Sequence, residues 1–171
     1  MDLPKRKLPR LNGYDYSAPG AYFITICTHN KKHLFSDIVG AIHESPENRL
    51  SPYGKLVEKL IGQLPARFDF IIPKYVIMPN HIHLIIEIKN DITTRAIRES
   101  PLQHHRSVID KAVGFLKMNV SKAMRPTYAD KIWQRSYHDH IIRGGADYRK
   151  IWEYIDTNPL KWEKDCFYNL N

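Results

Sequence analysis

The sequence has few cysteines, no long apolar run and no Walker-type glycine-rich loop, and each of these absences argues against a class of protein. Its two cysteines, Cys27 and Cys166, lie far apart, so neither a disulfide framework nor a cysteine-based zinc site is expected. No apolar stretch approaches the roughly 20 residues that cross a bilayer, and no signal peptide is evident. The missing glycine-rich loop gives no indication of ATP use. We therefore expect one soluble, cytoplasmic domain over residues 1–171.

Positive charge is the strongest feature of the composition. The formal net charge is +8 and the sequence pI is about 9.5, which favours a polyanionic partner, nucleic acid before an acidic membrane. The excess is concentrated at Lys5, Arg6, Lys7 and Arg10, within a segment 1–20 that we expect to be an irregular basic arm. This arm is a candidate for nucleic-acid binding, and a disordered solubilising tail is the alternative.

Hydrophobic periodicity orders the rest of the chain into strands and helices. Apolar stripes that follow Ser51-Pro52 and a capping box of Ser107 and Asp110 predict helices, the first of which is expected to end at Pro65. The predicted elements are strands at 21–28, 68–78, 81–88 and 132–143, helices at 51–65, from 107 and at 147–157, a loop or small hairpin at 29–50 and a loop at 89–106.

This order predicts an α+β fold. The succession β-α-β-β-α-β matches the ferredoxin-like split β-α-β arrangement, an antiparallel sheet with helices on one face. One helix is left over after these six elements. It can lie on the other face of the sheet.

Two histidines on the third predicted strand are candidate metal ligands. His81 and His83 are two residues apart, so their side chains point to the same face, while Ile82 and Leu84 point to the opposite, core-like face. Two neutral imidazoles one pleat apart are close enough to share one ion. The alternative is a pair of hydrogen-bonded sheet histidines.

The last predicted helix carries a second group of polar side chains. Lys150, Tyr154 and Asn158 are spaced by four residues and share one side of the helix. If this helix packs over the histidine face, the Asn158 side-chain oxygen could join the two imidazoles around an ion, and Tyr154 would lie beside it. The ordinary explanations are a core tyrosine and a helix end, because the following Pro159 disfavours the α conformation of Asn158.

Four stretches together resemble a known family, the REP-associated tyrosine transposases. These belong with the single-tyrosine insertion-sequence transposases in the HUH endonuclease superfamily. The stretches that carry the resemblance are YDYSAPGAYFITICT at 14–28, MPNHIHL at 78–84, WQ at 133–134 with YHDHIIR at 137–143, and YIDTNP at 154–159. They are widely separated, occur in the expected order and extend the likeness over nearly the whole chain.

The resemblance implies an activity and a site. It implies that His81, His83 and Asn158 bind Mg²⁺ or Mn²⁺, and that Tyr154 attacks a phosphate of single-stranded or hairpin DNA to give a covalent 5′-phosphotyrosine and a free 3′-OH. The implied location is the cytoplasm, on the nucleoid when DNA is bound, with no membrane partner. Assistance of phenol ionisation by Lys150 is inferred from its spacing alone.

Two other functions and two properties stay open. One alternative is a non-cleaving nucleic-acid-binding module of the same fold. The other is a metal-dependent phosphodiesterase that uses water, with Glu87 or Asp139 as the base. Two imidazoles suit Zn²⁺ at least as well as Mg²⁺, so the choice of Mg²⁺ or Mn²⁺ rests on the resemblance. The protein is expected to be a monomer or a homodimer.

Overall fold

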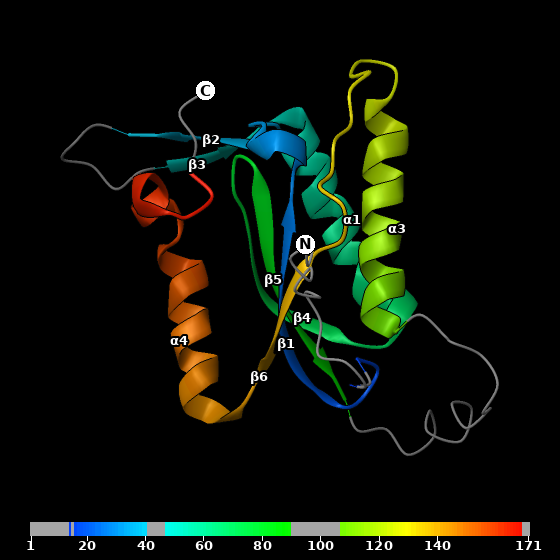
Figure 1. Ribbon diagram of the computed structural model, residues 1–171, viewed down its shortest axis with the longest axis vertical. Helices are drawn as coiled ribbons and strands as arrows, with labels where there is room; N and C mark the ends of the chain where they lie inside the picture. Colours follow the sequence, from blue (N-terminus) through cyan, green and yellow to red (C-terminus); the bar gives the residue numbers. More distant parts are fainter. Residues whose placement is uncertain (1–13, 15, 41–46, 90–106, 169–171) are drawn as a thin grey trace, which may run out of the picture.

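A four-stranded antiparallel sheet with helices on both faces forms the centre of the computed structural model (Figure 1), which describes residues 14, 16–40, 47–89 and 107–168. The strands, in their spatial order, are β4 (Ile71–Ile77), β5 (His81–Ile88), β1 (Gly20–Cys27) and β6 (His138–Ile142). Helices α1 (Pro52–Phe68) and α3 (Val108–Met124) lie on one face, and α4 (Gly144–Thr157) lies on the other (Figure 1). This order and direction confirm the ferredoxin-like α+β prediction.

Four smaller elements complete the described fold. β2 (Ser36–Val39) and β3 (Glu47–Leu50) pair in a separate two-stranded sheet, which confirms the predicted small hairpin. Two 3₁₀ helices, η1 (His29–Lys31) and η2 (Pro159–Lys164), follow β1 and α4.

Both faces of β5 are buried, and this explains why the sheet carries two hydrophobic layers. Ile82, Leu84 and Ile86 point toward α1 and α3 and belong to the main core. Ile85 points the other way, into a smaller cluster with isoleucines of β6 and α4. The helix left over in the sequence pattern therefore covers the face that carries the histidines.

The predicted starts of α1 and α3 are confirmed by their caps. Ser51 Oγ accepts a hydrogen bond from the Gly54 amide at 3.1 Å, and Pro52 occupies the first helical position. At α3, Ser107 Oγ accepts from the Asp110 amide at 3.1 Å while an Asp110 carboxylate oxygen accepts from the Ser107 amide at 3.2 Å. This is the reciprocal capping box that the sequence indicated.

Pro65 does not end α1, so that prediction was wrong. The helix continues to Phe68, and Asp69 in the left-handed region (φ 50°) ends it. The Phe68 ring stacks on Phe70 at 6.1 Å and meets Phe115 of α3 edge-on at 5.9 Å. Packing of this partly buried ring against the core favours a final helical turn after the proline, and β4 consequently begins only at Ile71.

The strand predicted at 132–143 is limited to β6, residues His138–Ile142. Before it, the Lys117 ammonium of α3 donates to the carbonyls of Gln134 and Ser136, and Ser136 adopts a positive φ of 66°. Carbonyls held in this way do not pair in a strand ladder. Helix α4 also begins earlier than predicted, at Gly144, where an Asp147 carboxylate oxygen accepts a hydrogen bond from the Arg143 amide at 2.9 Å.

Some predictions fall outside the described residues. The basic side chains Lys5, Arg6, Lys7 and Arg10 and almost all of the loop at 89–106 belong to this group. Within the described part of the chain, no helix has the length and apolar character needed to span a membrane.

The capping box of α3 provides a test of the fold. Replacing Ser107 by Ala removes the acceptor for the Asp110 amide, and we expect a loss of about 1 kcal/mol in the free energy of unfolding, measured by urea denaturation. Ser121→Ala, near the other end of the same helix, is the matched control and should change stability by about 0.5 kcal/mol or less. Equal effects of the two substitutions would contradict the capping role.

Candidate metal and nucleophile site

Strand β5 places His81 and His83 side by side on the sheet face covered by α4. Their rings are 4.5 Å apart, and their cross-strand neighbours on β1 are Cys27 and Thr25. Both side chains are at most 1% exposed. The segment after α4 contributes to this burial, because the Phe167 ring lies 4.6 Å from the ring of His81.

The Nδ1 atom of each histidine has a hydrogen-bonding neighbour. His83 Nδ1 lies 2.9 Å from Thr25 Oγ1, and His81 Nδ1 lies 2.9 Å from Asn80 Oδ1. The other nitrogen of His81, Nε2, is buried and has no hydrogen-bond partner among the described residues. A buried nitrogen without a partner is costly, and metal coordination is one way to satisfy it.

Burial keeps both imidazoles neutral at pH 7. It lowers the pKa of His81 to about 4, against the opposing effect of the Asp165 carboxylate. Burial also holds the pKa of His83 well below its usual value, and His81 acts in the same direction. Neutral imidazole is the form that binds metal ions.

Helix α4 reaches this site because its apolar side packs on the sheet. Ile151 and Ile155, one turn apart, are buried against Ile85 of β5 and Ile142 of β6. The spacing of four residues that aligns these isoleucines also aligns Tyr154 with Asn158, on a neighbouring side of the helix. Packing of the isoleucines therefore sets the distance of the polar side chains from the histidines.

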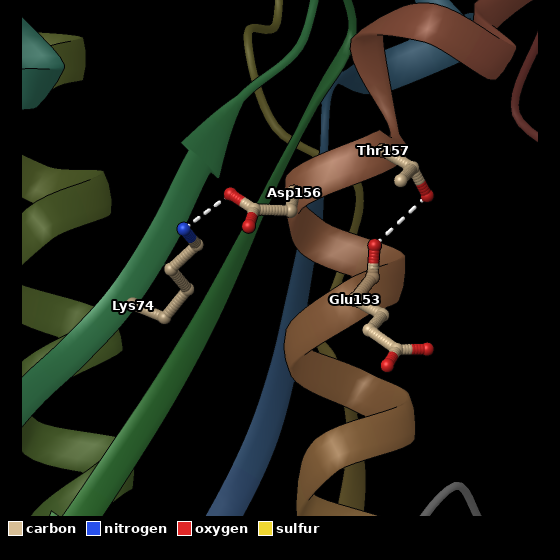
Figure 2. Close-up of polar contacts among 4 residues, drawn as sticks. All are labelled: Lys74, Glu153, Asp156 and Thr157. Atoms are coloured by element: carbon tan, nitrogen blue, oxygen red, sulfur yellow. Dashed lines mark hydrogen bonds and ion pairs between the residues drawn. The ribbon is translucent and has the colours of Figure 1, made fainter.

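Figure 2 shows the polar contacts that hold the last turn of α4. The Lys74 ammonium of β4 forms an ion pair with Asp156 and lies 4.9 Å from the centre of the Trp152 ring. Within the helix, the Thr157 hydroxyl donates to the Glu153 carbonyl at 2.8 Å (Figure 2). Lys74 therefore links the edge strand to the helical turn that carries Tyr154.

The Tyr154 hydroxyl lies between a histidine and a carboxylate. It is 3.4 Å from His83 Nε2 and donates to an Asp165 carboxylate oxygen at 3.2 Å. The ring meets Phe23 edge-on at 6.0 Å, and the side chain is 37% exposed, so a substrate can approach it. Burial, followed by the Asp165 carboxylate, raises the pKa of the phenol well above its usual value. The phenol is therefore protonated in this state.

Asn158 and Asp165 bring oxygen atoms to the same place. Asn158 is 2% exposed, and its amide nitrogen donates to an Asp165 carboxylate oxygen at 2.6 Å. Its side-chain oxygen is buried without a hydrogen-bond partner in the described part of the chain. Contrary to the effect expected from Pro159, the backbone of Asn158 is helical, with φ −58° and ψ −44°.

Asp165 is the site residue that the sequence patterns missed. Ligand atoms of His81, His83 and Asp165 lie within 4.8 Å of one another, closely enough to hold one ion. Asp165 follows a 3₁₀ helix and belongs to no periodic pattern, so no local signal pointed to it. The unpaired atoms of His81 and Asn158, with the carboxylate beside them, fit a divalent cation.

Three other predicted participants lie elsewhere. Lys150 is exposed on the turn before Tyr154, and its charge acts on Asp147, so its catalytic role stays a prediction. Asp139 as a catalytic base was wrong, because it pairs across from the core residue Ile24 and therefore points to the opposite sheet face.

Glu87, the other predicted base, is on the histidine face but at the far end of β5. It lies six residues beyond His81 and interacts with Tyr148. Burial and this carboxylate raise the pKa of the Tyr148 phenol to about 12. The Glu87 side chain therefore lies near the start of α4 and away from the candidate site.

Comparison with known proteins finds relatives over most of the chain. An uncharacterized protein of Haemophilus influenzae is 34% identical over 172 residues, which cover 95% of this chain and 93% of that protein. A second protein of that organism, inferred to be a REP-associated tyrosine transposase, is 26% identical over 150 residues, 86% of this chain and 74% of that protein. A solved REP-associated tyrosine transposase bound to a REP hairpin has a TM-score of 0.58 at 19% identity, over 90% of this chain and 74% of that one. No protein-family profile matches the sequence.

The fold is that of a transposase, because the sheet and its helices are arranged as in the hairpin-bound structure. Sequence identity over most of the chain extends the likeness to the Haemophilus proteins. The chain is similar to REP-associated tyrosine transposases in sequence and in fold, which agrees with the resemblance of its motifs.

The depressed pKa of His81 predicts a loss of stability in acid. Because the folded pKa is about 4 and the unfolded pKa is near 6.5, the unfolded state binds more protons between these values. Stability should fall as the pH drops from 6.5 to 4, by about 3 kcal/mol from His81 alone. Urea denaturation at several pH values should show a shallower fall for His81→Gln, with the exposed His138→Gln as the control. An identical pH profile for wild type and His81→Gln would contradict this assignment.

The Lys74 ion pair predicts local motion of α4. Because Lys74→Met removes the charge that holds Asp156, amide hydrogen exchange in the last turn of the helix should become up to about five-fold faster, the size expected of a partly exposed pair. Lys59→Met, at an exposed position on α1, is the matched control and should leave these amides unchanged. Unchanged exchange in Lys74→Met would show that the isoleucine packing alone holds this turn.

Proposed function

We propose that this protein cleaves and rejoins single-stranded DNA through a covalent bond to Tyr154, with the help of a divalent cation held by His81 and His83. The observation that carries the proposal is the position of the Tyr154 hydroxyl, 3.4 Å from His83 Nε2 and bonded to Asp165. Metal-assisted phosphoryl transfer needs a nucleophilic oxygen that lies next to the side chains that bind the metal ion.

The donor set supports Mg²⁺ or Mn²⁺ more strongly than the histidines alone do. Asp165 adds a carboxylate oxygen and Asn158 an amide oxygen to the two imidazole nitrogens. Oxygen donors suit Mg²⁺ and Mn²⁺, whereas imidazole suits Zn²⁺ at least as well. A bound cation would polarise the scissile phosphate and offset the negative charge of Asp165 near the phenol.

The chemical step is a transesterification at phosphorus. The Tyr154 oxygen forms a bond to the phosphorus and the bond from phosphorus to the 3′ oxygen breaks, which leaves a 5′-phosphotyrosine and a 3′-OH. Asp165, which already accepts the phenolic hydrogen bond, is the group that can take the phenol proton, and the leaving 3′ oxygen takes up a proton. The reverse reaction rejoins the strand without ATP, because one phosphoester replaces another.

Hairpin DNA is the proposed substrate. The solved relative is bound to a REP hairpin, and the net charge of +8 favours a polyanion. Lys5, Arg6, Lys7 and Arg10 remain the candidates for holding its backbone. Since Tyr154 lies against the histidines of its own chain, a monomer can assemble a complete site.

A covalent adduct tests the proposal directly. The protein is incubated with Mn²⁺ and a hairpin with single-stranded flanks, taken from repeats near its own gene, and then run on a denaturing gel. A label at the 3′ end of the DNA should move with the protein, and a label at the 5′ end should appear on a shorter strand with an extendable 3′-OH. Tyr154→Phe should lose the adduct, because it removes the nucleophilic oxygen.

Tyr148→Phe is the matched control, since it removes a phenol from the same helix at the Glu87 end and should still form the adduct. If the Tyr154→Phe variant still forms an adduct, Tyr154 is not the nucleophile. If cleavage occurs without an adduct, and the cleavage is lost when Asp165 is replaced, the result would support the phosphodiesterase that uses water, with Asp165 as the base. Tight hairpin binding without cleavage in Mn²⁺, Mg²⁺ or Zn²⁺ would support the non-cleaving module.

A further inference from the structure

Asn80, in the turn between β4 and β5, connects the candidate metal site to two distant backbone segments. It is 1% exposed. Its amide nitrogen donates to the carbonyls of Lys31 at 3.2 Å and Phe167 at 2.8 Å, and its side-chain oxygen lies 2.9 Å from His81 Nδ1. The amide nitrogen and the oxygen of this carboxamide therefore both face protein groups.

The two carbonyls fix the orientation of the Asn80 carboxamide. A carbonyl can only accept hydrogen bonds, so the NH₂ group must face Lys31 and Phe167, and the oxygen must face His81. In the flipped orientation, the Asn80 oxygen would face two carbonyl oxygens without a proton between them. The contact with His81 is therefore a hydrogen bond that His81 Nδ1 donates.

This orientation determines where the proton of His81 lies. A neutral imidazole carries one proton, and when Nδ1 holds it, Nε2 presents a lone pair. Nε2 is the buried atom that has no hydrogen-bond partner in the described part of the chain. His83 has no such constraint from Thr25, whose hydroxyl can donate or accept.

We propose that Asn80 is a positioning residue that holds His81 in the Nδ1–H tautomer and so keeps Nε2 ready to bind the cation. The inference rests on the metal site of the proposed function, although the tautomer itself exists without a metal. The turn is well suited to this role, because the Asn80 carbonyl accepts from the Thr28 amide at 2.8 Å and from the Thr28 hydroxyl at 3.0 Å. Both the backbone and the side chain of Asn80 are thus fixed in place.

The first measurement needs no metal and no substitution in the turn. In protein with ¹⁵N-labelled histidine and no metal, the ring nitrogen shifts report the tautomer, and His81→Gln identifies the His81 signals. We expect the proton on Nδ1 in the wild type. A proton on Nε2 would overturn the proposal at once.

The second measurement is the Mn²⁺ affinity by titration calorimetry. Asn80→Ala should weaken Mn²⁺ binding about 10-fold to 100-fold, the usual cost of losing a residue that orients a ligand, and should lose the Nδ1–H preference. Asn80→Asp keeps the acceptor that faces His81 Nδ1 and should keep the Nδ1–H tautomer, but it turns a second carboxylate oxygen toward the carbonyls of Lys31 and Phe167 and should therefore lower the stability of the turn. Asn119→Ala, which removes a carboxamide bonded to the Phe115 carbonyl of α3, is the matched control and should bind normally.

The outcomes separate this inference from the metal site itself. If the wild type binds no Mn²⁺, the proposed metal fails while the tautomer measurement still decides the role of Asn80. If the wild type binds Mn²⁺ and Asn80→Ala binds it equally well with an unchanged tautomer, the role of Asn80 is refuted. Weaker Mn²⁺ binding by an Asn80→Ala variant that keeps the Nδ1–H tautomer would also refute it, since the loss would then come from the turn and not from the acceptor.

Discussion

The packing of α4 on the sheet is the interaction on which the candidate site depends. Ile151 and Ile155 are buried against β5 and β6, and this contact holds α4 over the face that carries the imidazoles. Without this packing, His81 and His83 would be more exposed to water, and the Tyr154 hydroxyl would not lie beside His83. Apolar burial thus determines the position of the polar chemistry.

Burial in turn controls the charge states of the site. Removing the imidazoles from water keeps them neutral, which suits metal binding, while burial and the Asp165 carboxylate keep the Tyr154 phenol protonated. In terms of the proposed function, the two histidines are in the form that binds a metal ion, and the proposed nucleophile is not yet ionised. In the proposed function, a bound cation would lower the pKa of the phenol, which is the direction that attack on a phosphate requires.

Most of the fold could be predicted because the spacing of apolar residues along the chain indicates each strand and helix. Because successive side chains of β5 point to opposite faces, the sequence distinguished the core face of this strand from the face that carries the histidines. The capping box at Ser107 marked the start of α3. The errors arose where distant side chains overrule local preference. Phe68 packs against Phe115 of α3 and extends α1 past Pro65, and Lys117 binds the carbonyls of Gln134 and Ser136 and shortens β6.

By itself, the sequence determined which face of β5 carries the histidines, that Tyr154 and Asn158 share one side of a helix, and to which family the motifs point. Only the tertiary structure decided that the two groups meet, that Asp165 joins them, and that Asn80 orients His81. The reason is that side-chain periodicity is a property of neighbouring residues. Contacts of Asp165 and Asn80 join segments that are remote in the chain, and their geometry exists only after the helices have packed on the sheet.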